Sequence, residues 1–193
     1  MIKTTSILRE QLSDYSNPDS KISRMISKNE LFPIIRGLYE TNRSVSPYLL
    51  AGSIYGPSYI SFEYALSHYG LTPEAVYTVT CACFEKKKKK RYDTLFGSFI
   101  YQDVPSEVFP LGLEIHQEGD YSYRIATPEK ALCDQLYLLP PAKNQKELYF
   151  LLTESLRIEV SALRNLNRTD ILEYGEKYHS SNIKKLGLLL RRI

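Results

Sequence analysis

Residues 112–139 have the sequence GLEIHQEGDYSYRIATPEKALCDQLYLL, and this stretch decides the fold class. Its first half contains two strand-like segments, GLEIHQ and YSYRIA, joined at Glu118, Gly119 and Asp120, which are typical turn residues. Its second half changes to helical spacing, because apolar residues recur on one stripe until Pro140. Strands followed by helices, each in its own part of the chain, indicate an α+β domain.

Two segments upstream predict further strands of the same sheet. VYTVTCACF at residues 76–84 and YDTLFGSFIYQDV at residues 92–104 are rich in β-branched and aromatic residues. Together with the hairpin they predict a mostly antiparallel sheet over about residues 76–126. Helical patterns then continue over about residues 128–193, and we expect a C-terminal helical layer there.

A helix is also predicted before the sheet. Ser61 offers an N-cap with Tyr64 as its N3 residue, and Gly70 follows the apolar face as a typical C-terminal stop. We assign this helix, the sheet and the C-terminal helices to one domain, residues 44–193. A length of 193 residues suits one sizeable core with a short appended module.

The N-terminal segment predicts that appended module. Residues 3–15 place apolar side chains at helical spacing, and Asn17 with Pro18 can begin a second helix. LFPIIRGLYET at residues 31–41 then indicates a strand or a tight hairpin. Helix, helix and ribbon is the order of a winged helix, so residues 1–43 are predicted to form a short winged-helix-like DNA-binding module.

Composition narrows the function classes. The chain is 43% hydrophobic and 24% charged, as folded proteins are, and its net charge of +3 is too small to indicate a nucleic-acid-binding protein by itself. The N-terminus lacks the apolar run of a signal peptide, and no segment approaches the roughly 20 apolar residues that span a bilayer, so we expect a cytoplasmic protein. Three cysteines fit neither a disulfide scaffold nor a zinc ribbon, and we expect buried thiols at Cys81, Cys83 and Cys133.

Basic residues of the N-terminal module are the candidates for DNA contact. Lys21, Arg24 and Lys28 recur at intervals of three and four, and therefore share a face of the second predicted helix. In a helix-turn-helix protein such a face enters the major groove while basic residues on the wing hold the phosphates, a role for which Arg36 and Arg43 are placed. A solvated helix face is the alternative explanation.

A run of positive charges lies between two predicted strands, at a hairpin tip or at the edge of the sheet. It is either a solvated loop or a possible basic patch for nucleic acid or an acidic partner. The run consists of Lys86, Lys87, Lys88, Lys89, Lys90 and Arg91.

Catalytic patterns are scarce. The histidines are scattered, and neither a zinc-protease motif, a nucleophile elbow nor a phosphate-binding loop occurs, so we expect a non-enzymatic protein without cofactor or metal. The one catalytic alternative is Glu85, Lys86 and Lys87, because some metal-dependent nucleases place an acid, a spacer and a lysine at the end of a strand. A second acid is then required, and Glu63 and Glu74 are the nearby candidates.

Three charged residues open the helix after the last strand. Glu129 lies in the first turn, where a negative charge is favourable, and Lys130 with Asp134 forms an i,i+4 pair. These positions are explained by a structural role.

Three motifs resemble those of a known family. YISFEYALSHYGLTPE at residues 59–74, the pattern of Thr94, Gly97 and Tyr101, and RIATPEKALCDQLYLL at residues 124–139 are similar to the antitoxin of AbiE-type toxin–antitoxin systems (AbiEi, type IV). Members of this family are often described as predicted transcriptional regulators. The resemblance extends over about residues 5–140, and the three motifs together are its specific part.

The resemblance implies a bacterial protein of abortive-infection type whose winged helix binds operator DNA and represses its own operon. RGLYE at residues 36–40 matches the end of the family's winged-helix module, and Lys21, Arg24, Lys28 and Arg36 would face DNA. The larger domain would counteract a nucleotidyltransferase-like toxin. Its family-motif residues, most of them interpreted as fold-determining, are Tyr59, Ser61, Tyr69, Gly70, Gly97, Pro128, Glu129, Lys130 and Asp134.

Sequence reasoning therefore predicts an antitoxin and autorepressor that binds operator DNA and either the toxin or the toxin's target. The segment before RGLYE is shorter than in the family, where a separate helix precedes the recognition helix. The first alternative is a regulator that binds a protein partner without binding DNA. The second is the metal-dependent nuclease.

Overall fold

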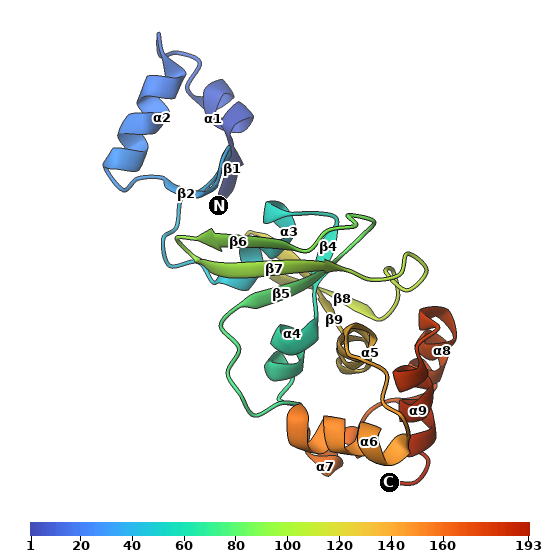
Figure 1. The fold of residues 1–193 in the computed structure, drawn as a ribbon. Coiled ribbons are helices and arrows are strands. Elements are labelled where there is room, and N and C mark those ends of the chain that lie inside the picture. Colours follow the sequence, from blue (N-terminus) through green and yellow to red (C-terminus); the bar gives the residue numbers. More distant parts are fainter.

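The chain begins with a small module at one end of the molecule (Figure 1), in a computed structural model that describes residues 1–193. Its hairpin residues Ile34 and Leu38 belong to the main hydrophobic core. Strand β1 leads directly into helix α1, helix α2 follows, and strands β2 and β3 form a hairpin. The hairpin lies beside β1 in an antiparallel sheet of order β1-β3-β2. The bounds are β1 Ile2–Thr4, α1 Thr5–Gln11, α2 Pro18–Ser27, β2 Phe32–Ile35 and β3 Leu38–Glu40.

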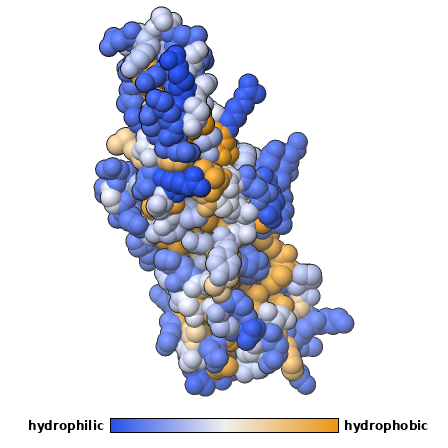
Figure 2. Space-filling model, turned by 90° about the vertical axis from the view of Figure 1, so that its left-hand side faces the viewer, coloured by the Kyte–Doolittle hydropathy of each residue, from blue (hydrophilic) through white to orange (hydrophobic).

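This N-terminal module has a hydrophobic core of its own. Leu8, Ile22 and Leu31 are buried against one another, separately from the main core. Asn17 caps α2, since its side-chain oxygen accepts a hydrogen bond from the Ser20 N–H (3.0 Å). The face drawn in Figure 2 shows mostly hydrophilic side chains over this part of the molecule.

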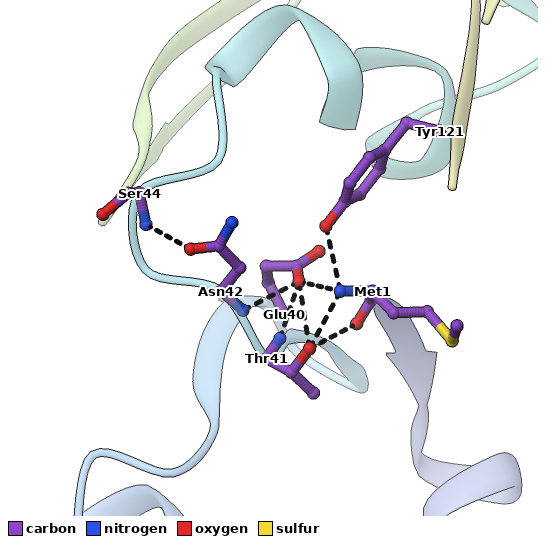
Figure 3. A network of polar contacts seen from close by, with 6 residues as sticks. All are labelled: Met1, Glu40, Thr41, Asn42, Ser44 and Tyr121. Atoms are coloured by element: carbon purple, nitrogen blue, oxygen red, sulfur yellow. Dashed lines mark hydrogen bonds and ion pairs between the residues drawn. The ribbon is translucent and has the colours of Figure 1, made fainter. Parts of the chain in front are cut away.

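A buried carboxylate joins the module to the body (Figure 3). Glu40 is fully buried and accepts hydrogen bonds from the amino group of Met1 and from the Asn42 N–H (2.9 Å). The same amino group donates to the hydroxyl of Tyr121 (2.9 Å), the first residue of strand β9 (Tyr121–Ala126) in the body. Burial raises the pKa of Glu40, but the amino group and the backbone donors outweigh burial, so the pKa lies below its ordinary value.

The body is built on a six-stranded sheet of order β6-β7-β5-β4-β9-β8. Two pairings, β4 with β9 and β5 with β7, are parallel, and the other three are antiparallel. The sheet is therefore mixed, with antiparallel pairings in the majority as the sequence predicted, and the two parallel pairings were not predicted. The remaining strands are β4 Ser58–Ile60, β5 Val79–Cys83, β6 Lys90–Thr94, β7 Gly97–Asp103 and β8 Leu113–Glu118.

The segment predicted as one strand over residues 92–104 is a hairpin. Strands β6 and β7 are antiparallel neighbours with Thr94 opposite Gly97. The Thr94 hydroxyl donates to the Gly97 carbonyl (3.0 Å) and accepts from the Phe96 N–H (3.1 Å), which stabilises the turn between them. Strand β7 lies between β5 and β6. It runs antiparallel to β6 and parallel to β5, and this second pairing is one of the two parallel pairings of the sheet.

Helices cover the sheet and extend away from the N-terminal module (Figure 1). Helix α4 packs on α5, and α5 also contacts α8 and α9. The chain is thus α+β, with its C-terminal third helical. No helix combines the length and the apolar character needed to cross a membrane. The bounds are a 3₁₀ helix Pro47–Leu50, α3 Ala51–Ile54, α4 Phe62–His68, α5 Pro128–Leu138, α6 Gln145–Phe150, α7 Val160–Arg164, α8 Arg168–Tyr178 and α9 Ser181–Leu189.

Candidate functional sites

The basic residues predicted on the second helix all belong to α2 or its C-terminal cap. Arg24 and Lys28 are exposed, and Lys21 is half-buried with its ammonium 5.0 Å from the centre of the Tyr15 ring. That cation–π contact holds Lys21 against the turn that precedes α2. The Arg24 Nε donates a long hydrogen bond to the Ser20 carbonyl of its own helix (3.4 Å), so the terminal nitrogens of Arg24 and the ammonium of Lys28 are the donors left for an external anion.

Arg36 and Arg43 lie before and after strand β3. Arg36 is exposed in the turn between β2 and β3, and Arg43 follows β3 with its guanidinium 5.8 Å from the centre of the Phe32 ring. Neither these two arginines nor the three basic residues of α2 take part in an ion pair. These five predicted cations therefore have no carboxylate partner, and neither has Lys3, whose ammonium donates to the Gln11 amide oxygen.

The acidic residue of α2 is neutralised from the neighbouring helix. The Arg9 guanidinium donates two hydrogen bonds to the Asp19 carboxylate (2.8 and 2.9 Å). Those hydrogen bonds hold the pKa of Asp19 below its ordinary value. The exposed pair adds little stability, but it leaves the outer surface of α2 predominantly positive. Sequence analysis did not identify this role of Arg9.

The Lys86 to Arg91 run forms a loop that continues into β6, an edge strand of the sheet. Its ends are already engaged: the Lys86 ammonium lies 5.2 Å from the centre of the Tyr55 ring, and Arg91 pairs with Asp93 (2.9 Å). Only the four lysines between them are exposed without such a partner. The run is therefore a smaller cationic surface than its sequence suggests.

Glu85 and Lys87 lie at an open cavity of about 510 Å³, together with Asp103 at the end of β7. The Asp103 carboxylate is already occupied, because it accepts hydrogen bonds from the Lys86 N–H (3.0 Å), the Lys87 N–H and the Cys83 thiol (2.9 Å). No group of three or more His, Cys, Asp or Glu side chains is arranged as metal ligands in this structure.

The two acids considered as partners of Glu85 lie elsewhere. Glu63 accepts a hydrogen bond from the Gln135 amide (3.0 Å), and Glu74 pairs with Arg157 (2.5 Å). Neither residue lines the cavity of Glu85 and Lys87. The expectation that Glu63 or Glu74 supplies the second acid is therefore wrong.

Motif residues from two distant segments meet in one buried cluster. One oxygen of Asp134 accepts hydrogen bonds from the hydroxyls of Tyr59 (3.0 Å) and Ser61 (2.6 Å). Its other oxygen accepts from the Lys130 ammonium (2.8 Å) and from the Tyr178 hydroxyl. The Tyr178 hydroxyl itself accepts a hydrogen bond from Lys130 (2.5 Å). The predicted i,i+4 pair of Lys130 and Asp134 is thus present.

This cluster is closed to solvent. The Lys130 and Asp134 side chains are 0% exposed, and the Tyr59 and Tyr178 rings lie 5.2 and 4.9 Å from the ammonium. Burial, together with the charge of Asp134, raises the pKa of both tyrosines well above the ordinary value. No substrate can reach a cluster enclosed in this way. Its role is to connect β4, α5 and α8 through charge-assisted hydrogen bonds.

Two other motif positions organise the ends of helices. Pro128 is the first residue of α5, where its missing N–H costs nothing. The Glu129 carboxylate accepts a hydrogen bond from the Asn167 N–H (2.8 Å) and so holds the N-cap of α8. Asn182 of α9, which the sequence did not single out, connects that helix to the segment after α5, because its amide donates a hydrogen bond to the Pro140 carbonyl (3.0 Å).

The remaining motif positions lie at turns or at the surface. Gly70 directly follows the C-cap of α4 with φ +68°, and Gly97 begins β7 with φ +139°, so both adopt a backbone that favours glycine. Tyr69 donates to the Glu114 carboxylate of β8 (3.3 Å). These contacts hold α4 and β8 together, which fits a fold-determining role.

Tyr178 is the member of the cluster that sequence reasoning missed. It lies at the end of α8, and the available signal was a pair of tyrosines, Tyr174 and Tyr178, four residues apart in a predicted helix. That spacing places both on one helix face. It does not indicate which buried charge the face will meet.

No protein-family model matches the sequence, and no curated protein matches it. The resemblance to AbiE-type antitoxins therefore depends on the sequence motifs alone.

Proposed function

We propose that the protein is a DNA-binding regulator of the AbiE-type antitoxin kind, in which the N-terminal module contacts operator DNA. The observation that carries the proposal is an N-terminal module with the element order β1-α1-α2-β2-β3, a β1-β3-β2 sheet and five predicted cations without a carboxylate partner. Two helices followed by a hairpin that pairs with an earlier strand are the elements of a short winged helix.

In this proposal α2 is the recognition helix. Its ten residues span about 15 Å, at about 1.5 Å per residue, a length that fits a major groove roughly 12 Å wide. Arg24 and Lys28 would approach bases or phosphates, while Arg36 in the hairpin turn and Arg43 after it would contact the phosphate backbone. The neutralisation of Asp19 by Arg9 removes the charge that would oppose this approach.

The body is proposed to bind the second partner, a cognate toxin or the toxin's target, without catalysis. What supports this part is the resemblance, together with the way its motif residues Tyr59, Ser61, Lys130 and Asp134 contact one another in a single core cluster. Such residues maintain a fold and leave partner contacts to the surface.

An anisotropy titration tests DNA binding. The full-length protein is titrated into labelled duplex from upstream of its own gene and into scrambled duplex, each at two salt concentrations. We expect tighter binding to the upstream duplex and a steep loss of affinity with salt, because counterions return to the phosphates. Arg24→Ala is expected to weaken binding to the upstream duplex about tenfold or more, the order of 1–3 kcal/mol for an arginine that contacts a base.

Arg191→Ala is the matched control, because Arg191 is exposed near the C-terminus, far along the chain from the module. It should leave the affinity unchanged. Equal, weak binding of both duplexes by the wild-type protein would contradict sequence-specific DNA binding. It would favour the regulator that acts only through a protein partner.

A further inference from the structure

The centre of the sheet contains an incomplete pairing. Strands β4 and β9 are parallel neighbours, but Ile60 and Ile125 are their only paired residues. On its other side β4 pairs with β5 along its whole length. The residues that precede Ile60 in β4 and Ile125 in β9 are therefore not paired with each other. This leaves a space between the first parts of the two strands.

A cavity of about 260 Å³ opens at that place. It is lined by Gly52 and Ser53 of α3, by Pro57 and Ser58 at the start of β4, and by Ser122, Tyr123 and Arg124 of β9. Its lining residues include one cation, three serines and one tyrosine, and no carboxylate. The volume lies just below the roughly 300–1,000 Å³ of typical small-molecule sites, so the cavity suits a small polar group.

Several hydrogen-bond donors of this cavity have no partner within the chain. Arg124 is exposed, takes part in no ion pair, and makes no side-chain hydrogen bond within the chain. Ser53 and Ser122 are exposed as well, whereas the Ser58 hydroxyl donates to the Tyr55 carbonyl (2.6 Å). A guanidinium presents five donors in a planar fork, which matches the oxygens of a phosphate group.

A neighbouring tyrosine binds an acid of the adjacent strand β8. Tyr48 lines a small recess that shares Arg124 with the cavity, and its hydroxyl donates to the Glu118 carboxylate (2.6 Å). This hydrogen bond raises the pKa of Tyr48 to about 12, so Tyr48 adds no negative charge near neutral pH. The positive charge of Arg124 thus has no counterion in contact with it.

We propose that the cavity between β4 and β9 binds a phosphate group, with Arg124 as the cationic donor and Ser53 and Ser122 as hydroxyl donors. The group is either the phosphate monoester of a small molecule or a phosphate of the DNA backbone. This site is independent of the proposed role of α2, because none of its residues belongs to the N-terminal module.

Isothermal titration calorimetry of the full-length protein with inorganic phosphate, at constant ionic strength set by chloride, tests the proposal. We expect saturable binding with Kd on the order of 1 mM. Arg124→Gln should weaken it at least tenfold. Ser122→Asp, which places a carboxylate at an exposed position of the cavity, should do the same. Arg191→Gln is the matched control and should bind phosphate as the wild type does.

The source of the phosphate follows from a second titration, with duplex DNA lacking terminal phosphates. Weaker DNA binding by Arg124→Gln assigns the cavity to a backbone phosphate, and unchanged DNA binding assigns it to a small molecule. The proposal is overturned if phosphate does not saturate the wild-type protein, or if Arg124→Gln and Ser122→Asp, folded by circular dichroism, bind phosphate as tightly as Arg191→Gln.

Discussion

At the residue scale, Asp134 shows how a charge is kept inside this protein. Its two carboxylate oxygens accept four hydrogen bonds, from Tyr59, Ser61, Lys130 and Tyr178. A buried ion pair is tolerated only when such donors replace the lost water. Removing one partner leaves the other charge buried and uncompensated, which is far more costly than the net worth of the pair.

We therefore predict that Asp134→Ala lowers the free energy of unfolding by about 3–5 kcal/mol, because Lys130 then remains as an isolated buried cation. Urea denaturation followed by circular dichroism measures the change. Arg157→Ala is the control, since it breaks an ion pair whose side chains are 63% and 47% exposed. It should cost less than about 1 kcal/mol. Equal losses in the two variants would contradict a structural role for the buried cluster.

At the element scale, the strongly patterned segments could be predicted and the short ones could not. The hairpin of β8 and β9 and the helix α5 follow directly from the pattern of residues 112–139. Strand β4 has three residues, all buried, so it shows no alternation of apolar and polar side chains. Strand β1 is equally short and continues into α1, whose helical spacing dominates the sequence. Both strands exist because of partners far along the chain.

The candidate sites could likewise be predicted only where their residues lie close together in the sequence. The spacing of Lys21, Arg24 and Lys28 on one helix is local, and sequence alone revealed it. The cavity at Arg124 depends on how β4 and β9 diverge, which no local pattern encodes.

The N-terminus of α4 shows a further difference between sequence and structure. Ser61 occupies the N-cap position as predicted, but its hydroxyl donates to Asp134 and does not cap the helix. Thr80 of β5 caps the helix in its place. The Thr80 hydroxyl accepts a hydrogen bond from the Tyr64 N–H (3.1 Å) and donates one to the Ser61 carbonyl (2.6 Å). A neighbouring strand thus supplies the cap of this helix.

Thr80→Val is expected to destabilise the protein by about 1–2 kcal/mol, because it removes both hydrogen bonds while preserving side-chain shape. Hydrogen exchange should show the loss of protection concentrated at the first turn of α4. Thr78→Val is the control, since Thr78 is half-buried and its hydroxyl makes no hydrogen bond within the chain. A uniform increase in exchange over the whole body would speak against a capping role.

At the scale of the whole molecule, the junction at Glu40 holds the N-terminal module on the body. Its carboxylate has a pKa below the unfolded reference of 4.5. A carboxyl of this kind stabilises the folded state above its unfolded pKa, and the contribution disappears as the pH falls through the lower folded value. The attachment of the module should therefore weaken in acid.

We predict that Glu40→Gln is less stable than the wild type at pH 7 and loses less stability between about pH 5 and about pH 3, because it lacks the titrating carboxylate. Urea denaturation at a series of pH values gives both curves. Glu30→Gln, which changes an exposed acid of the same module, should follow the wild-type curve. Parallel curves for wild type and Glu40→Gln would rule out the junction as an acid-sensitive contact.

The separate core of the N-terminal module also bears on folding during synthesis. Leu8, Ile22 and Leu31 lie close together in sequence, so this core can form soon after the module leaves the ribosome. The body cannot close so early, since Asp134 bonds to Tyr59, 75 residues before it, and to Tyr178, 44 residues after it. During synthesis the small N-terminal core would thus form before the last helices have packed against the sheet.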